Sequence, residues 1–501
     1  MSIDPARGAS MPAGAVADAV GLGASRGLGQ ALASLRGLIG ARVLGPTTYG
    51  VWQGVRIALV LADLSHLGAQ NALEREIPLA RGADDAARAT GIRLAGLRAT
   101  LAGVAPVVLG CALLAALAAR RDDGALGAAL AAAGAAALLQ QLFHLAAADL
   151  RAEARFRRSA ASGLAAAATG AALAYPLARA LGLAGFVAAT ALGMAAGLAV
   201  ARRPGRAVPP SGSGAADGPR AWRGLALGLV RTGLPILLIH AVRPLKRTVD
   251  KAAILALAGA TAAGLYGIGD TLAALLVILP GSAAAVVAPR ALERFARTGD
   301  PSGLREAVAA PMDILSRTVP ALAGLGAIAA EVAIHGLLPR FEAGVPAAKV
   351  LALTALAAAI EGPALNAIVA IGRQGTAALV SLAFVATATA GQIAVLVAGL
   401  GIEAVAGVAV VVGFGQAVAV AGLGYRWLDA GPAGTARALG PPLARLGYGG
   451  LAFLAVEAAA ARGLLPGGAA VRAAVFLAAV APLAWRLRAG LSGLRGPGGT
   501  P

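Results

Sequence analysis

The stretch PILLIHAVRPLKRTVDK, residues 235–251, places charged groups inside an apolar segment that runs from about residue 225 to 257. At 100° per residue, five ionisable side chains share one helical face and a sixth lies at its edge. The five are His240, Arg243, Arg247, Asp250 and Lys251, and the sixth is Lys246. Charged groups at the bilayer centre cost about 2.5–3.5 kcal/mol on insertion scales and usually face a wet cavity or a bundle interior. We therefore predict one long spanning helix that lines a cationic, water-filled cavity. The alternative is a span that ends near Val242, with the charges at the membrane surface.

The composition is that of a polytopic membrane protein. Of 501 residues, 58% are hydrophobic and only 13% are charged. We predict an all-α fold with about fourteen transmembrane helices, each long enough to cross about 30 Å of hydrocarbon. Their expected ranges are 19–43, 49–72, 92–119, 125–148, 160–180, 183–201, 225–257, 263–288, 311–336, 346–371, 376–399, 402–425, 440–461 and 467–486.

Loop arginines set the expected orientation. They concentrate in alternate loops, including residues 75–93, 151–158, 202–223 and 290–305, and are fewer in the others. This positive-inside pattern predicts that both termini are cytoplasmic. A span that ended at Val242, followed by another at 252–270, would place the 290–305 loop outside, so one long helix is favoured. The net charge of +19 belongs to these loops, so we expect membrane lipids, and no nucleic acid, as their partners.

The expected domain order follows from the spans and one polar linker. Residues 1–18 form a cytoplasmic segment without the pattern of a cleaved signal peptide. Residues 19–201 form a six-helix lobe, and residues 202–223, rich in Pro, Gly, Ser and Ala, form a cytoplasmic linker. A second six-helix lobe covers 224–426, and residues 427–501 hold two extra helices and a cytoplasmic tail. The sequence ALER follows a Tyr-Gly pair in both lobes, at 49–75 and 266–294, which indicates a pseudo-two-fold repeat.

Several segments resemble one family of membrane proteins. ARVLGPTTYGVW at 41–52 and LGAQNALEREIPLARGAD at 67–84 are similar to the first two helices of polysaccharide-biosynthesis flippases of the O-antigen type. AGLYGIGDTLAALLVILP at 263–280, LLPRFEAGVPAAKVLAL at 337–353 and NAIVAIGRQGTAALVSL at 366–382 resemble later helices of the same family. These proteins belong to the multidrug/oligosaccharidyl-lipid/polysaccharide exporter superfamily. The resemblance implies two six-helix lobes around a central cavity, alternating access, and translocation of a polyprenyl-pyrophosphate-linked oligosaccharide.

A pyrophosphate cannot cross hydrocarbon unaided, and arginine suits it because its planar fork stays charged and binds phosphate bidentately. Two arginines inside the first spans extend the candidate set. The predicted substrate-binding residues are Arg36, Arg56, Arg243, Lys246, Arg247, Lys251 and His240. For Arg36, the alternative is a side chain that extends to the outer membrane surface.

Acidic residues inside spans are candidates for coupling to H⁺ or Na⁺. They are Asp63, Asp250, Asp270, Glu331 and Glu361. For Asp250 the favoured reading is a structural salt bridge with Lys246, Arg247 or Lys251. The other histidines, His66, His144 and His335, are expected to be hydrogen-bonded packing residues. We expect no cofactor and no metal site, and Cys111 stands alone.

The leading function is a flippase for a lipid-linked oligosaccharide, with polymerase or glycosyltransferase machinery as further partners. A multidrug or cation-coupled exporter of the same superfamily is the alternative within transport, although cationic drugs favour acidic, aromatic cavities and aromatic residues are only 4% here. A membrane enzyme of glycan assembly would need a large outer loop or a tight carboxylate and histidine cluster, so we expect no enzyme. A scaffold for cell-surface polysaccharide assembly is the remaining alternative.

Overall fold

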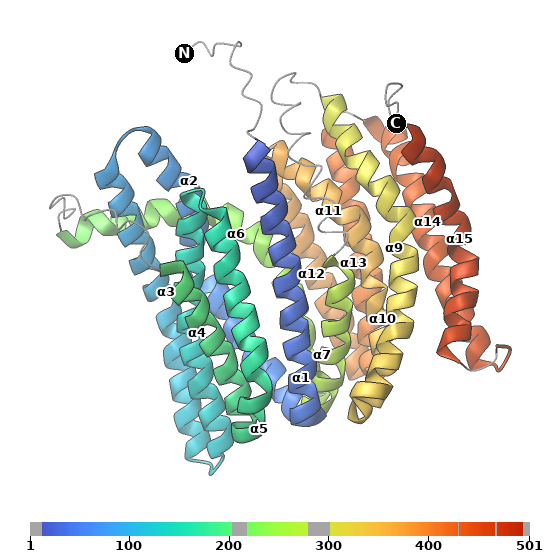
Figure 1. Ribbon diagram of the computed structural model, residues 1–501, viewed down its shortest axis with the longest axis horizontal. Coiled ribbons are helices and arrows are strands. Elements are labelled where there is room, and N and C mark those ends of the chain that lie inside the picture. Colours follow the sequence, from blue (N-terminus) through green and yellow to red (C-terminus); the bar gives the residue numbers. More distant parts are fainter. Residues whose placement is uncertain (1–12, 203–217, 279–300, 429, 466–467, 494–501) are drawn as a thin grey trace. The chain divides into compact units, whose positions relative to one another are not determined.

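The computed structural model describes residues 13–202, 218–278, 301–428, 430–465 and 468–493 (Figure 1). In these ranges the chain forms helices and no strand, which confirms the all-α prediction. By length and composition alone, eight helices of the described ranges could cross a membrane.

Helices of the first half are longer than the expected spans. They are α1 (Ala13–Ser65), α2 (Ala69–Gly82), α3 (Ala86–Ala119), α4 (Gly124–Ala152) and α5 (Phe156–Arg202). The labels α1 and α5 each cover two helices, which meet at Gly45 (φ 74°) and Gly182 (φ 57°) in non-helical backbone conformations that favour glycine. These breaks lie between the expected spans 19–43 and 49–72 and between 160–180 and 183–201, as predicted. The expected span over 49–72 is wrong at its end. Helix α1 stops at Ser65, and α2 is a separate amphipathic helix that carries Glu74, Arg75 and Glu76.

Helices of the second half follow the expected spans more closely. They are α6 (Gly218–Leu257), α7 (Gly259–Leu276), α9 (Pro301–Leu337), α10 (Val345–Ala352), α11 (Thr354–Ala370), α12 (Gln374–Val397), α13 (Gly401–Trp427), α14 (Gly431–Ala461) and α15 (Ala469–Gly493), with a 3-10 turn η1 (Pro339–Gly344). Helix α6 continues through Val242 to Leu257, as predicted for one long helix.

The chain divides into two compact units. The first contains Met1–Arg36 and Leu61–Leu237, and the second contains Gly37–Val60 and Leu238–Pro501. The division falls inside α1 and α6, whereas the lobes expected from sequence, 19–201 and 224–426, stay a prediction. In the first unit α4 packs between α3 and α5, which Figure 1 shows side by side, and α2 packs on α3 and α4.

The second unit has its main apolar core around α9. Helices α10, α11, α14 and α15 all pack on α9, and α13 packs on α10, α11 and α12. Phe453 of α14 and Phe476 of α15 meet edge to face with ring centroids 5.9 Å apart, and both are buried in this core with Met312. The two C-terminal helices therefore share the core of the second unit.

An ion-pair quartet ties α9, α10, α14 and α15 together. Lys349 Nζ of α10 lies 2.7 Å from Glu331 Oε2 of α9 and also pairs with Glu457 of α14. Arg472 of α15 places Nη2 2.7 Å from Glu331 Oε1 and Nη1 3.3 Å from Glu457 Oε2. Two carboxylates and two cations thus neutralise one another in a mostly buried position.

Lys349→Met is expected to lower the free energy of unfolding by about 1–2 kcal/mol, because it leaves two neighbouring carboxylates with only Arg472 to neutralise them. The magnitude is moderate because the side chains of Lys349 and Glu331 each keep 17% exposure to solvent. Denaturant unfolding of the detergent-solubilised protein measures the loss, and Lys349→Arg serves as the charge-conserving control. Equal stability of Lys349→Met and the parent protein would contradict a stabilising role for the quartet.

Candidate functional site

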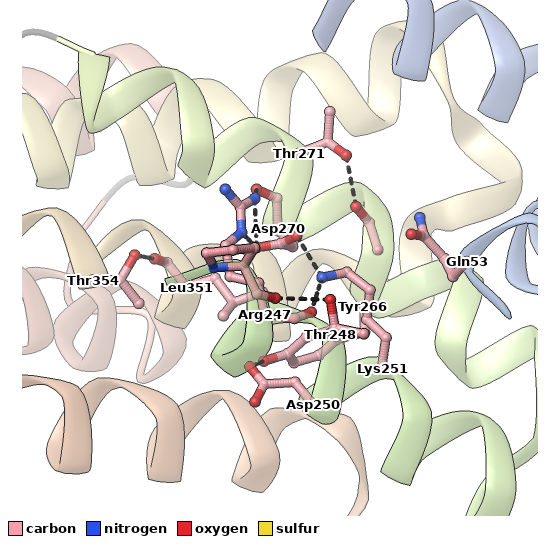
Figure 2. Close-up of polar contacts among 12 residues, drawn as sticks. Gln53, Arg247, Thr248, Asp250, Lys251, Tyr266, Asp270, Thr271, Leu351 and Thr354 are labelled. Atoms are coloured by element: carbon pink, nitrogen blue, oxygen red, sulfur yellow. Dashed lines mark hydrogen bonds and ion pairs between the residues drawn. The ribbon is translucent and has the colours of Figure 1, made fainter. Parts of the chain in front are cut away.

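Helices α6 and α7 build the charged cluster of the second unit (Figure 2). Arg247 and Lys251 are one turn apart on α6, so their side chains lie on one face and meet Asp270 of α7 together. Arg247 Nε donates to Asp270 Oδ1 at 2.9 Å, and its Nη2 donates to the Asp270 carbonyl oxygen at 3.0 Å. Lys251 Nζ lies 2.7 Å from Asp270 Oδ2. One carboxylate therefore holds two cations.

Burial makes this pairing obligatory. Asp270 is 8% exposed and Lys251 only 4%. A buried charge without a partner costs several kcal/mol. Asp270 and Lys251 must therefore stay paired when the protein is folded. Arg247 differs, because its side chain keeps 37% exposure while two of its nitrogens hold Asp270. Within the described part of the chain, its Nη1 has no acceptor.

Asp250 does not take the partner that the sequence indicated. We expected a salt bridge to Lys246, Arg247 or Lys251, but Arg247 and Lys251 pair with Asp270. The Asp250 side chain leaves α6 in another direction and accepts a hydrogen bond from Tyr266 Oη at 3.1 Å. The amide of Gln392 on α12 lies beside this carboxylate, fully buried, and neither of its polar atoms has a hydrogen-bond partner at ordinary distance among the described residues.

Arg56 adds a further cation in the second unit. Its Nη1 donates to Gln53 Oε1 at 3.2 Å, and Gln53 is fully buried. Arg56 is close enough to Lys251 for their charges to repel each other. Among the residues that the structure describes here, Arg56, Arg247 and Lys251 outnumber the carboxylates of Asp250 and Asp270 by one. The cluster therefore has capacity for an anion.

Of the remaining predicted cationic residues, Lys246 and Arg36 have described side chains. Lys246 Nζ lies against Gly413 of α13. Arg36 belongs to the first unit, where Nη1 donates to Thr190 Oγ1 at 2.9 Å and the guanidinium lies 5.9 Å from the centre of the Phe186 ring. The side chains of His240 and Arg243 lie outside the described residues.

The other predicted acids are in three separate places. Glu331 belongs to the ion-pair quartet, and Glu361 of α11 accepts from Gln416 Nε2 of α13 at 3.1 Å. Asp63 lies in the first unit, where Oδ1 accepts from Gln140 Nε2 at 2.6 Å and lies 3.1 Å from His144 Nδ1. Of the five predicted acids, all of which the structure describes, Asp250 and Asp270 lie near Arg247 and Lys251.

Two residues of the site were missed in the sequence, Tyr266 and Gln392. Tyr266 stood in the repeated Tyr-Gly pair, which was used only to relate the halves. Gln392 is the sole strongly polar group late in the apolar run of α12, and that isolation was a usable signal.

Comparisons with known proteins rest on structure alone, because no protein-family model and no curated protein sequence matches the chain. An inward-facing multidrug resistance MATE family transporter of the MOP superfamily superposes with a TM-score of 0.59 at 14% identity, over 85% of this chain and 97% of that one. An outward-facing structure of such a transporter gives 0.58 at 15% identity, over 82% and 96%. A MATE structure in the bent conformation gives 0.54 at 15% identity, over 84% and 96%.

The chain has the fold of MATE-family transporters. This fold agrees with the predicted polytopic, all-helical architecture. The superpositions cover nearly all of each similar structure and 82–85% of this chain.

Proposed function

We propose that this chain is an alternating-access transporter of the bacterial cytoplasmic membrane that moves a polyprenyl-pyrophosphate-linked oligosaccharide. The termini are cytoplasmic, and polymerase or glycosyltransferase machinery is the expected partner. The observation that carries the proposal is the cationic excess of Arg56, Arg247 and Lys251 over Asp250 and Asp270. Similar folds occur in inward- and outward-facing forms, which supports alternating access.

The geometry of Arg247 suits a pyrophosphate. Asp270 occupies Nε and Nη2 and fixes the plane of the guanidinium. The remaining Nη1 edge is directed away from this pair on a half-exposed side chain, and it can donate to a phosphate oxygen without breaking the ion pair. Arg56 supplies a second guanidinium in the same unit. Two guanidinium groups suit the two phosphates of the pyrophosphate that the resemblance to oligosaccharide flippases implies as part of the substrate.

Coupling to H⁺ or Na⁺ belongs at Asp250 in this proposal. Asp270 already neutralises two cations, whereas Asp250 has a phenol and an uncharged amide beside it and, nearby, the charge of Lys251, which pairs with Asp270. A carboxylate in such a position can accept a proton or, with the amide oxygen, a small cation.

A multidrug exporter is the second candidate function, because the similar structures include transporters named for multidrug resistance. Cationic drugs require an acidic site. The excess of cations around Asp270 favours the anionic substrate.

Arg56→Gln is expected to weaken binding of undecaprenyl pyrophosphate by about 10–100-fold, since a hydrogen bond to a charged group contributes about 1.5–3 kcal/mol. The amide introduced by this substitution can still bond Gln53, so the fold should survive. Calorimetry on the solubilised full chain measures the affinity, with ethidium as a cationic probe for the exporter alternative.

Arg121→Gln, in the exposed turn after α3, is the matched control and should bind as the parent protein does. Tight binding of ethidium with no binding of undecaprenyl pyrophosphate would reject the flippase in favour of the exporter. Equal pyrophosphate affinity for Arg56→Gln and Arg121→Gln would remove Arg56 from the site.

A further inference from the structure

The first unit contains a polar pocket of about 470 Å³ formed by α1, α2, α4, α5 and the turn before α2. Its volume is typical of a ligand-binding pocket. The polar side chains that line it are Ser25, His66, Gln70, Asn71, Glu74, His144, Arg151 and Ser159. Two histidines line this pocket, and their polar contacts differ.

His144 is oriented by a carboxylate. Its Nδ1 lies 3.1 Å from Asp63 Oδ1, which also accepts from Gln140 Nε2 at 2.6 Å. An imidazole nitrogen without a proton would repel this oxygen, so the neutral ring carries its proton on Nδ1. The basic nitrogen is therefore Nε2. The side chain is 39% exposed, so water in the pocket can reach it.

His66 has the opposite arrangement. Its Nδ1 accepts a hydrogen bond from the backbone N–H of Gly68 at 3.0 Å, so the neutral ring carries its proton on Nε2. A second proton would have to bind Nδ1, where it would break this bond and leave a buried N–H unsatisfied. His66 is only 7% exposed. It is thus held neutral, whereas His144 can gain a proton without losing any bond.

The charges around His144 are otherwise balanced. Glu74 of α2 is paired with Arg151 of α4 at 2.7 Å. From α3, Arg93 is engaged by Asp149 and Glu153 of the α4 end. The residues that α5 contributes to the pocket, Ser159, Ala160 and Gly163, are uncharged. Asp63 is therefore the carboxylate that a protonated His144 would neutralise.

We propose that His144 is the proton-binding group of the first unit, oriented by Asp63 and open to this pocket. A proton from water adds to Nε2 and forms an imidazolium–carboxylate pair, and its release restores the neutral ring. This step rests on the proposed transport function, to which it adds a protonation site separate from the charged cluster of the second unit. It also replaces the expectation that His144 is only a packing residue.

The chain has four histidines, so they can be observed individually. Full-length protein labelled with ¹⁵N-histidine in nanodiscs is titrated by NMR from pH 5 to 8, and His144→Gln and His66→Gln assign the signals. Proton binding at Nε2 converts the His144 signal from the Nδ1–H form to the imidazolium, and this conversion is the expected result. The His66 signal should keep its Nε2–H form throughout. Asp63→Asn should convert the neutral His144 ring into a mixture of tautomers.

A His144 signal that stays neutral to pH 5, or a His66 signal that titrates in its place, would overturn the inference. His66→Gln is the matched control, with the same substitution in the same pocket, and both variants must unfold at the temperature of the parent protein. In vesicles that hold a fluorescent undecaprenyl-pyrophosphate glycan, His144→Gln should remove the pH dependence of translocation and His66→Gln should retain it. A titrating His144 without any glycan movement would reject the flippase proposal and leave the protonation site standing.

Discussion

Asp270→Ala is expected to lower the free energy of unfolding by about 3–5 kcal/mol, the largest effect of any single substitution in the charged cluster. The change removes the partner of both Arg247 and Lys251, and Lys251 is 4% exposed. An uncompensated buried ammonium cannot reach water without moving α6 away from α7. Denaturant unfolding of the solubilised protein, followed by tryptophan fluorescence, measures the loss.

Asp250→Asn provides the matched control, because the same helix loses a carboxylate that holds no cation. It should cost only about 1 kcal/mol, the value of one hydrogen bond from Tyr266. The combined variant Asp270→Leu, Arg247→Met, Lys251→Met should regain most of the stability, since apolar side chains of similar size replace the whole set. An Asp270→Ala protein as stable as Asp250→Asn would show that Lys251 is solvated.

Gly50→Val is the second large prediction, with an expected cost of about 3 kcal/mol. A Cβ atom at Gly50 would lie 1.6 Å from the carbonyl oxygen of Ala260, and one at Gly264 would lie 1.9 Å from the carbonyl oxygen of Pro46. The second half of α1 and the start of α7 therefore touch backbone to backbone. A valine would separate them and disturb the neighbouring contact between Tyr49 and Thr271.

Gly407→Ala on α13 is the control, because a Cβ there meets nothing within 4 Å. It should be neutral or stabilise by up to about 1 kcal/mol, as alanine is the better helix former. Thermal unfolding in detergent compares the two variants. Similar unfolding temperatures would show that α1 and α7 can separate at little cost.

The helices could be predicted from sequence because each needs only a long apolar run. The single helix through Val242 was also predictable. A span that ended there, followed by an additional one, would have placed every later loop on the opposite side of the membrane. The end of α1 at Ser65 was not predicted, although residues 66–72 (HLGAQNA) are more polar than a membrane span and include Gly68, where the chain turns into α2. These residues were the local signal for the boundary.

The sequence predicted which side chains share one face of α6, but it did not predict which ion pairs they form. The four-residue spacing of Arg247 and Lys251 places them together on any helix, and the structure keeps them together. Their partner depends on how α7 packs on α6. This packing brings Asp270 to both cations, although Asp250 is closer to them in the sequence. For the same reason, no local pattern indicated that Asp63 would meet His144, 81 positions further along the chain.

The ion-pair quartet of α9, α10, α14 and α15 consists of two pairs, each of which is electrically neutral. Glu331 and Lys349 already satisfy one another on α9 and α10, and Glu457 and Arg472 do the same on α14 and α15. Without α14 and α15, Glu331 and Lys349 would therefore still neutralise each other, and neither α9 nor α10 would be left with an unpaired charge from the quartet.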